Sequence, residues 1–128
     1  MELPGEWVEK ADVFLREAKR HIEEGIYWLS CFESQQAAEL YLKALHVAAA
    51  GLYPFTHDLS ELLESLKALN FNPPDDLFVI ADALTAHYTL LRYPGRKSVS
   101  YTKSLAERCV SYAERIIEWV KRVSEMEG

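Results

Sequence analysis

Apolar residues recur at helical spacing along almost the whole chain. From Glu6 to Glu24 they stand three and four positions apart, which predicts a one-sided amphipathic helix. The segment from Trp28 to Ala50 has no glycine or proline and is apolar nearly all round, which predicts a central helix that other elements must cover. Gly25 and Gly51 are expected to end these two helices, and the short connection between them predicts antiparallel neighbours.

Three more helices complete the predicted pattern, over residues 57–69, 75–91 and 101–125. Thr56 or Asp58 is the expected N-cap of the first, and Glu61 follows Asp58 at the spacing of a capping box. Five helices with short connections predict one all-α domain over residues 1–128, built as a mostly up-and-down helical bundle.

The composition is that of one folded domain with an excess of acidic residues. Of the 128 residues, 49% are apolar and 27% are charged, which excludes wholesale disorder. The net charge of −6 excludes a strongly basic nucleic-acid footprint, although a local basic patch stays open. The N-terminus has no basic segment leading into an apolar stretch, and no apolar run has membrane-spanning length. We therefore expect a cytoplasmic protein without a membrane segment.

One narrow polar stripe interrupts the apolar surface of the central helix. Gln36, Glu39, Lys43 and His46 fall within a sector of about 80° when each residue turns the helix by about 100°. Two interpretations are open. Glu39 and Lys43 form an i,i+4 ion pair on a solvated edge, or Lys43 pairs with a phosphate while Glu39 and Gln36 orient it by hydrogen bonds.

Further candidate residues lie at the helix connections. We expect the imidazole of His57 to bond a nearby carbonyl at a helix start, with a catalytic role as the alternative. Three cations, Arg92, Arg96 and Lys97, stand among proline and glycine before the last helix. They form either a solvated loop or a site for an anion such as a phosphate. His87 is expected at the side of the bundle.

The cysteines and histidines show no metal-ligand spacing. Cys31 and Cys109 each stand in an apolar helical context and are expected to be buried free thiols in a reducing cytosol. No two histidines are spaced as metal ligands, and there is neither a glycine-rich phosphate loop nor a nucleophile elbow. We therefore expect no metal and no cofactor, and the chain by itself shows little sign of an enzyme.

Three local patterns occur in an order that is typical of one known family. They are Ser34-Gln35-Gln36-Ala37-Ala38-Glu39 followed by Lys43, then His57-Asp58-Leu59, then Arg92-Tyr93-Pro94. With the number and order of helices, they make the full chain resemble the HEPN family (higher eukaryote and prokaryote nucleotide-binding domain). It most resembles the small prokaryotic members that are often encoded beside a minimal nucleotidyltransferase, in pairs that can behave as toxin–antitoxin modules.

The resemblance implies a compact helical domain, commonly dimeric, that is linked to nucleotides or RNA. Many HEPN proteins are metal-independent ribonucleases, with a signature of an Arg, a polar residue directly after it and a His four to six positions on. Here Tyr93 and Pro94 follow Arg92, and no His occurs downstream. The usual ribonuclease motif is therefore not present after Arg92.

These observations predict a homodimer that binds a nucleotide or RNA and partners a nucleotidyltransferase. A second reason for the dimer is that the central helix has more apolar circumference than four short neighbours are expected to cover. The expected ligand-binding residues are Gln36, Glu39, Lys43, His57, Arg92, Arg96 and Lys97. One alternative is a divergent metal-independent endoribonuclease toxin that uses Arg92 with His57 or His87. The other is a helical protein-interaction module without a ligand site.

Overall fold

The computed structural model of the chain describes residues 1–92 and 100–126. In this part of the chain it contains five α-helices: α1 (Gly5–Glu23), α2 (Tyr27–Ala50), α3 (Leu59–Ala68), α4 (Asp75–Arg92) and α5 (Lys103–Met126). Each helix begins and ends within two residues of its expected position. The all-α bundle predicted from the hydrophobic pattern is confirmed.

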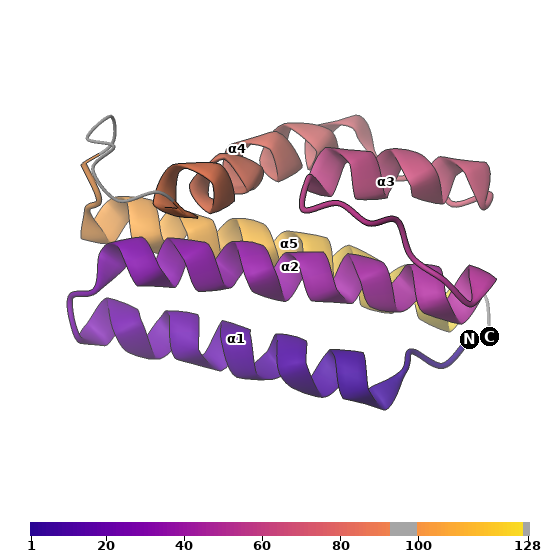
Figure 1. The fold of residues 1–128 in the computed structure, drawn as a ribbon, viewed down its shortest axis with the longest axis horizontal. Coiled ribbons are helices and arrows are strands. Elements are labelled where there is room, and N and C mark those ends of the chain that lie inside the picture. The colour runs from indigo at the N-terminus through magenta and orange to yellow at the C-terminus, as the bar shows by residue number, and fades with distance from the viewer. Residues whose placement is uncertain (93–99, 127–128) are drawn as a thin grey trace.

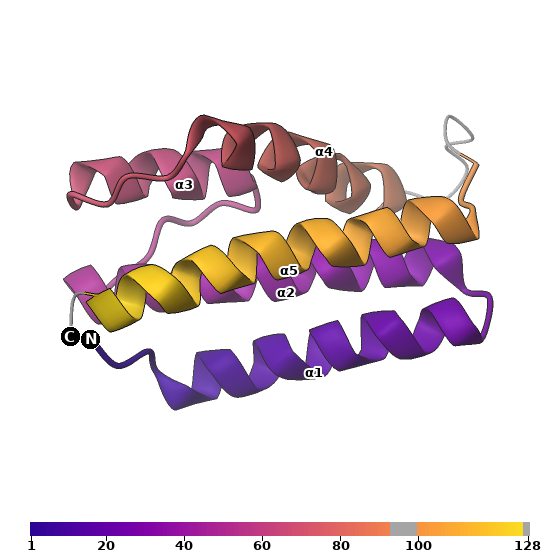
Figure 2. The ribbon, with the colours of Figure 1, turned by 180° about the vertical axis from the view of Figure 1, so that it is seen from behind.

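Helix α2 lies at the centre of the bundle. Helix α1 packs beside it in the opposite direction, and the α3–α4 pair covers the side away from α1 (Figure 1). Helix α5 lies along α2 and runs in the same direction, as the view from behind shows (Figure 2). Met1 lies beside the last turn of α5, where its N-terminal ammonium donates to the carbonyl of Ser124 at 2.7 Å.

The other four helices cover nearly all sides of α2. From Glu33 to His46, every side chain except Gln36 and Leu40 is buried. Fully buried residues such as Leu42 and Leu45 each stabilise the fold by about 1.5–3 kcal/mol. One chain thus covers most of the apolar circumference of α2, and covering this helix does not require a second copy.

Local sequence signals set the ends of α2 and α3. Gly51 ends α2 in a left-handed conformation with φ 78°, which glycine adopts without a steric penalty. Asp58 is the N-cap of α3, and its carboxylate accepts from the backbone N–H of Ser60 and of Glu61. The expected capping box is altered, because the Glu61 carboxylate accepts from the Thr56 hydroxyl at 2.7 Å. That hydroxyl in turn accepts from the N–H of Asp58 at 3.1 Å.

Both cysteines are free and buried, as expected. Within residues 1–92 and 100–126, no helix combines the length and apolar character needed to cross a membrane.

Candidate functional site

The carboxylate of Glu39, on α2, is the centre of a polar cluster under the surface. Lys43 Nζ donates to its Oε2 at 2.9 Å, and Gln35 Nε2 donates to its Oε1 at 3.2 Å. Nδ1 of His57 lies 3.1 Å from both oxygens. Gln36 Nε2 donates to Gln35 Oε1 at 2.7 Å and reaches Glu39 Oε1 at 3.5 Å. We call these five residues the Glu39 cluster.

Helical spacing and one loop position bring the cluster together. Gln35, Glu39 and Lys43 are four residues apart on α2, so their side chains lie one above another on one face. His57 comes from the segment before α3, where its carbonyl accepts from Gln35 Nε2 at 2.9 Å. The backbone N–H of Leu59 donates to the hydroxyl of Thr85 on α4 at 3.0 Å, which ties this segment to a second helix.

His57 is the member of the cluster that opens to solvent. Its side chain is 49% exposed, whereas that of Glu39 is 6% exposed. In the neutral ring with the proton on Nδ1, that N–H donates to Glu39 and Nε2 is left as an acceptor. Its ring stacks on Tyr88 of α4 with the centroids 4.3 Å apart. The expectation that this imidazole bonds a carbonyl is wrong, because its partner is a carboxylate.

Lys43 is a buried cation with an internal partner. The residue is 7% exposed, pairs with Glu39, and places its ammonium 5.2 Å from the ring centroid of Tyr53. The interpretation of Glu39 and Lys43 as a pair on a solvated edge is wrong for this reason. An ammonium has three donors, and the bond to Glu39 uses one of them.

The four residues of the polar stripe on α2 do not all belong to one hydrogen-bonded cluster. His46 does not take part in the cluster: its Nδ1 bonds the carbonyl of Leu42 at 2.9 Å, and the residue is 2% exposed. Burial lowers the pKa of His46 from its ordinary value, and the nearby charge of Lys43 acts in the same direction. The other members, Gln36, Glu39 and Lys43, do share hydrogen bonds or lie next to each other.

The three cations that the sequence offers as an anion site lie at the end of α4 or in the segment that follows it. Arg92 is the last residue of α4, and Arg96 and Lys97 lie outside the described residues. Tyr88, one helical turn before Arg92, stacks on Phe32 of α2 with the ring centroids 5.9 Å apart. Tyr88 also stacks on the ring of His57, whose Nδ1 contacts the Glu39 carboxylate. This turn of α4 therefore lies beside the Glu39 cluster.

Sequence reasoning missed Gln35, Tyr53 and Tyr88. For Gln35 a signal existed, since it precedes Glu39 by four residues, the spacing of neighbours on a helix face. No sequence spacing indicates that Tyr53 lies against Lys43 or that Tyr88 lies against His57, because these contacts join different elements.

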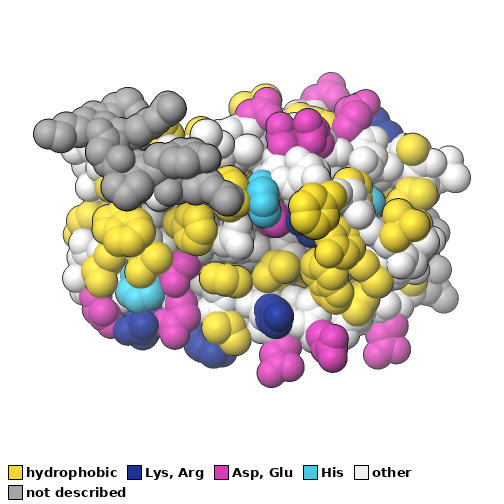
Figure 3. All heavy atoms as spheres, in the orientation of Figure 1, with side chains coloured by type: hydrophobic (Ala, Val, Ile, Leu, Met, Phe, Trp, Pro, Cys, Tyr) yellow, Lys and Arg dark blue, Asp and Glu magenta, His cyan; other side chains and the backbone are white. Residues whose placement is uncertain are grey.

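A groove lies next to the cluster on the α1 side. It has a volume of about 900 Å³ and is lined by residues of α1 that include Trp7 and Phe14, together with Leu40 of α2. Trp7 packs edge-on against Tyr53 with the centroids 4.8 Å apart, so the groove adjoins the ring that covers Lys43. On the face shown in Figure 3, hydrophobic side chains gather beside a histidine, and acidic side chains line the edges.

Comparison with known proteins identifies the family. Among solved structures, the chain is similar to TT1696 from Thermus thermophilus, with 33% identity and a TM-score of 0.84 over 91% of this chain and 94% of that one. It is also similar to ST0689, an archaeal HEPN homologue, with 35% identity and a TM-score of 0.75 over 94% and 97% of the two chains. An HEPN domain protein from Thermotoga maritima has 27% identity and a TM-score of 0.76 over 94% and 98%.

No curated protein matches the chain. The HEPN domain matches residues 5–123, which is nearly the whole chain. The chain therefore belongs to the HEPN domain family.

Proposed function

We propose that this HEPN protein binds a nucleotide or a segment of RNA at the Glu39 cluster and does not cleave it. The observation that carries the proposal is a buried Lys43–Glu39 pair that connects to the surface through the half-exposed His57. A buried ion pair adds little net stability, because the loss of hydration offsets the attraction between the charges. We therefore attribute the Lys43–Glu39 pair to ligand recognition and not to stability.

The cluster has donors suited to a phosphate. The Lys43 ammonium has two donors beyond the one that Glu39 accepts, and charge-assisted hydrogen bonds to phosphate oxygens are short and strong. When His57 is protonated, its second ring nitrogen adds a donor on the exposed side. Glu39 and Gln36 then act by orienting these groups, and the adjacent Gln35 shares that role.

Aromatic rings next to these donors suit the bases of the ligand. Tyr53 lies against Lys43, and Trp7 lies between Tyr53 and the groove on α1. Unstacked bases bind proteins by stacking on such rings, and the groove has the size of a small-molecule site. Because Tyr88 of α4 stacks on His57, Arg92, Arg96 and Lys97 are expected to extend the binding surface that begins at Lys43.

The alternative function as a ribonuclease rests on one specific contact. The pairing of Glu39 with Nδ1 of His57 is the arrangement that holds a general base in one tautomer and orientation. Of the two histidines considered for this role, His57 is favoured, since His87 is 8% exposed and its Nδ1 bonds the hydroxyl of Tyr101. The second alternative, a protein-interaction module, rests on Phe55, which is 96% exposed beside the cluster.

The proposal also includes two protein partners, a second copy of this chain and a nucleotidyltransferase. The family resemblance favours a homodimer and a nucleotidyltransferase partner, as in a toxin–antitoxin module. The exposed side chains of Trp28, Phe55 and Val79 are candidates for burial in such contacts. Light scattering at micromolar concentration should give twice the chain mass of 14.7 kDa. A mass that stays at one chain over a wide concentration range would contradict the dimer.

Binding of ATP and of a short single-stranded RNA tests the proposal. Lys43→Ala combined with Arg92→Ala should weaken RNA binding at least about tenfold and reduce its salt dependence by about one phosphate contact per residue. The matched control is Lys67→Ala, because Lys67 also lies over a ring, that of Phe78, and pairs with an acid on its own helix. The control should bind as the wild type does.

Circular dichroism separates binding from folding in this experiment. The double variant should keep its helical signal while it loses affinity. Equal loss of both would show that Lys43 and Arg92 are structural, and unchanged affinity in a folded variant would place the ligand elsewhere.

A further inference from the structure

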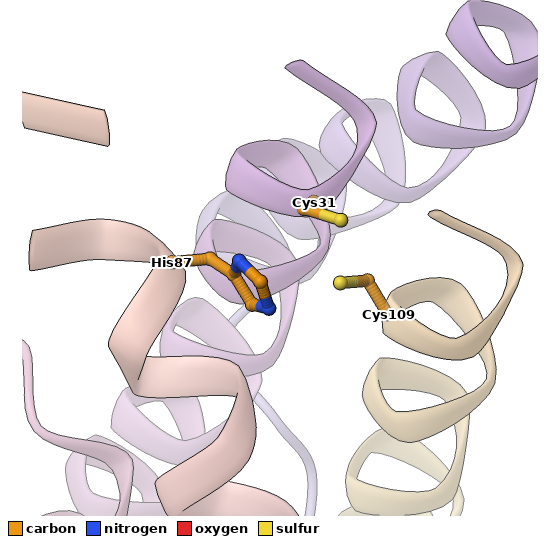
Figure 4. Close-up of side chains that lie close together, drawn as sticks. All are labelled: Cys31, His87 and Cys109. Atoms are coloured by element: carbon orange, nitrogen blue, oxygen red, sulfur yellow. The ribbon is translucent and has the colours of Figure 1, made fainter. Parts of the chain in front are cut away.

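Three side chains with metal-binding atoms, none of them a member of the Glu39 cluster, meet between α2, α4 and α5. Cys31 comes from α2, His87 from α4 and Cys109 from α5, and one ligand atom of each lies within 4.8 Å of those of the others. All three residues are buried. Figure 4 shows the three side chains extending from their separate helices toward a common space. In the sequence they are 56 and 22 positions apart, so no spacing motif marks them.

Tyr101 holds the ring of His87 in an orientation that is typical of a metal-binding histidine. The hydroxyl of Tyr101 lies 2.9 Å from Nδ1 of His87, and the two rings pack edge to face. This contact leaves Nε2 as the nitrogen available to a metal. Histidine ligands in proteins are commonly fixed in this way, by a hydrogen bond to the ring nitrogen that does not bind the metal. The thiol of Cys31 donates to the carbonyl of Leu105 at 3.8 Å, a weak bond that a metal is able to replace.

The ligand set selects the kind of metal. Two thiolates and an imidazole suit Zn²⁺, whereas Mg²⁺ and Ca²⁺ prefer oxygen ligands. With metal–ligand bonds of about 2.0–2.3 Å, the ligand atoms of a tetrahedral site stand about 3.5 Å apart. Any two of the three atoms therefore need to approach each other by about 1.3 Å at most to reach that spacing.

We propose that Cys31, His87 and Cys109 form a Zn²⁺ site with the fourth position open to water or to another ligand. Each Sγ–Zn²⁺ bond forms as the thiol loses its proton to solvent, so no oxidant or reductant takes part. Bound Zn²⁺ joins α2, α4 and α5, and it stabilises the folded chain because the unfolded chain does not hold the three ligands together.

Cobalt binding tests the site in the full-length, reduced, metal-free protein. One Co²⁺ per chain should bind, with a thiolate-to-metal charge-transfer band in the near ultraviolet and the visible bands of a tetrahedral ion. Zn²⁺ should displace it and raise the thermal unfolding midpoint. Absence of these bands at one equivalent of Co²⁺ would overturn the proposal, as would formation of a Cys31–Cys109 disulfide under air with no metal binding after reduction.

Variants assign the ligands. Cys31→Ser and Cys109→Ser should each weaken the charge-transfer band, and His87→Gln should keep it but lower the Co²⁺ affinity at least about tenfold. Tyr101→Phe tests the positioning contact and should lower the affinity less. The matched control is His21→Gln, which removes a buried histidine that pairs with a carboxylate on α2 and should bind Co²⁺ as the wild type does.

If the serine variants do not fold, His87→Gln and His21→Gln still decide the question. Equal Co²⁺ affinity in these two variants would exclude His87 as a ligand.

Discussion

Two glutamates of α2, six residues apart, each pair with a histidine from another part of the chain, and the two pairs differ in their access to solvent. In the pair His21–Glu33, Nδ1 lies 2.6 Å from the carboxylate, and the two side chains are 11% and 10% exposed. The other ring nitrogen of His21 lies 3.2 Å from a guanidinium nitrogen of Arg20. In the pair His57–Glu39 the carboxylate is as buried, but the imidazole is 49% exposed.

This difference separates a structural contact from a candidate site. His21 contacts protein groups with both nitrogens and joins α1 to α2, so a ligand has little access to it. His57 contacts the carboxylate with one nitrogen and presents the rest of its ring to solvent. The Glu39 carboxylate also pairs with the buried ammonium of Lys43. Among the described residues, no lysine or arginine pairs with the Glu33 carboxylate. The two pairs thus share their residue types and differ in solvent access and in the cation beside the carboxylate.

The largest expected difference between the pairs is in stability. Glu39→Ala should lower the free energy of unfolding by about 3–5 kcal/mol, because it leaves the buried charge of Lys43 without a partner. Glu33→Ala should cost about 1–3 kcal/mol, since it removes the hydrogen-bond partner of the buried His21 Nδ1. Urea unfolding followed by circular dichroism measures both changes.

A double variant shows whether the unpaired charge is the cause. Glu39→Met combined with Lys43→Met removes both charges and should recover most of the stability lost in Glu39→Ala. A larger loss in Glu33→Ala than in Glu39→Ala would reverse the comparison.

A smaller difference is expected in the pH dependence of the Glu33 pair. Burial raises the pKa of Glu33, against the opposing effect of the hydrogen bond from His21. The folded state therefore favours the protonated carboxyl, and the stability gained from it is lost as the pH rises through the raised pKa. Glu33→Gln keeps the side chain neutral. Its stability relative to the wild type should improve as the pH rises from the ordinary glutamate value through the raised pKa of Glu33.

Urea unfolding of the two proteins at several pH values tests this sign. A stability difference that does not change with pH, or that moves against the variant as the pH rises, would show that burial does not raise the pKa of Glu33 in the folded chain.

The smallest expected effect is on RNA cleavage. We expect the wild-type protein to show no metal-independent cleavage of a structured RNA above background. No histidine follows Arg92 in the sequence, so no imidazole from that segment is there to transfer a proton to or from the reacting oxygens. Gel analysis of RNA incubated with chelator measures the activity. Cleavage that is lost in Arg92→Ala and in His57→Gln but kept in His21→Gln would establish the ribonuclease alternative.

The sequence alone predicted the five helices and most of their ends. Helix periodicity, a glycine such as Gly51 and an N-cap such as Asp58 act through neighbours a few residues away, so the chain carries these signals locally. The i,i+4 stripe on α2 likewise indicated Glu39 and Lys43 as neighbours, because helix geometry alone brings them together. What the sequence left open was whether that pair lies in solvent or in the core.

Only the tertiary structure decided that question and placed the partners from other elements. The packing of the segment before α3 against α2 and α4 brings His57 to Glu39 and leaves its ring half exposed. The packing of α4 and α5 on α2 brings His87 and Cys109 to Cys31, across separations of 56 and 78 positions along the chain. Such contacts depend on how helices pack, and helix packing has several solutions for one hydrophobic pattern. For this reason, the tertiary packing of the helices determines which side chains form a site built from several elements.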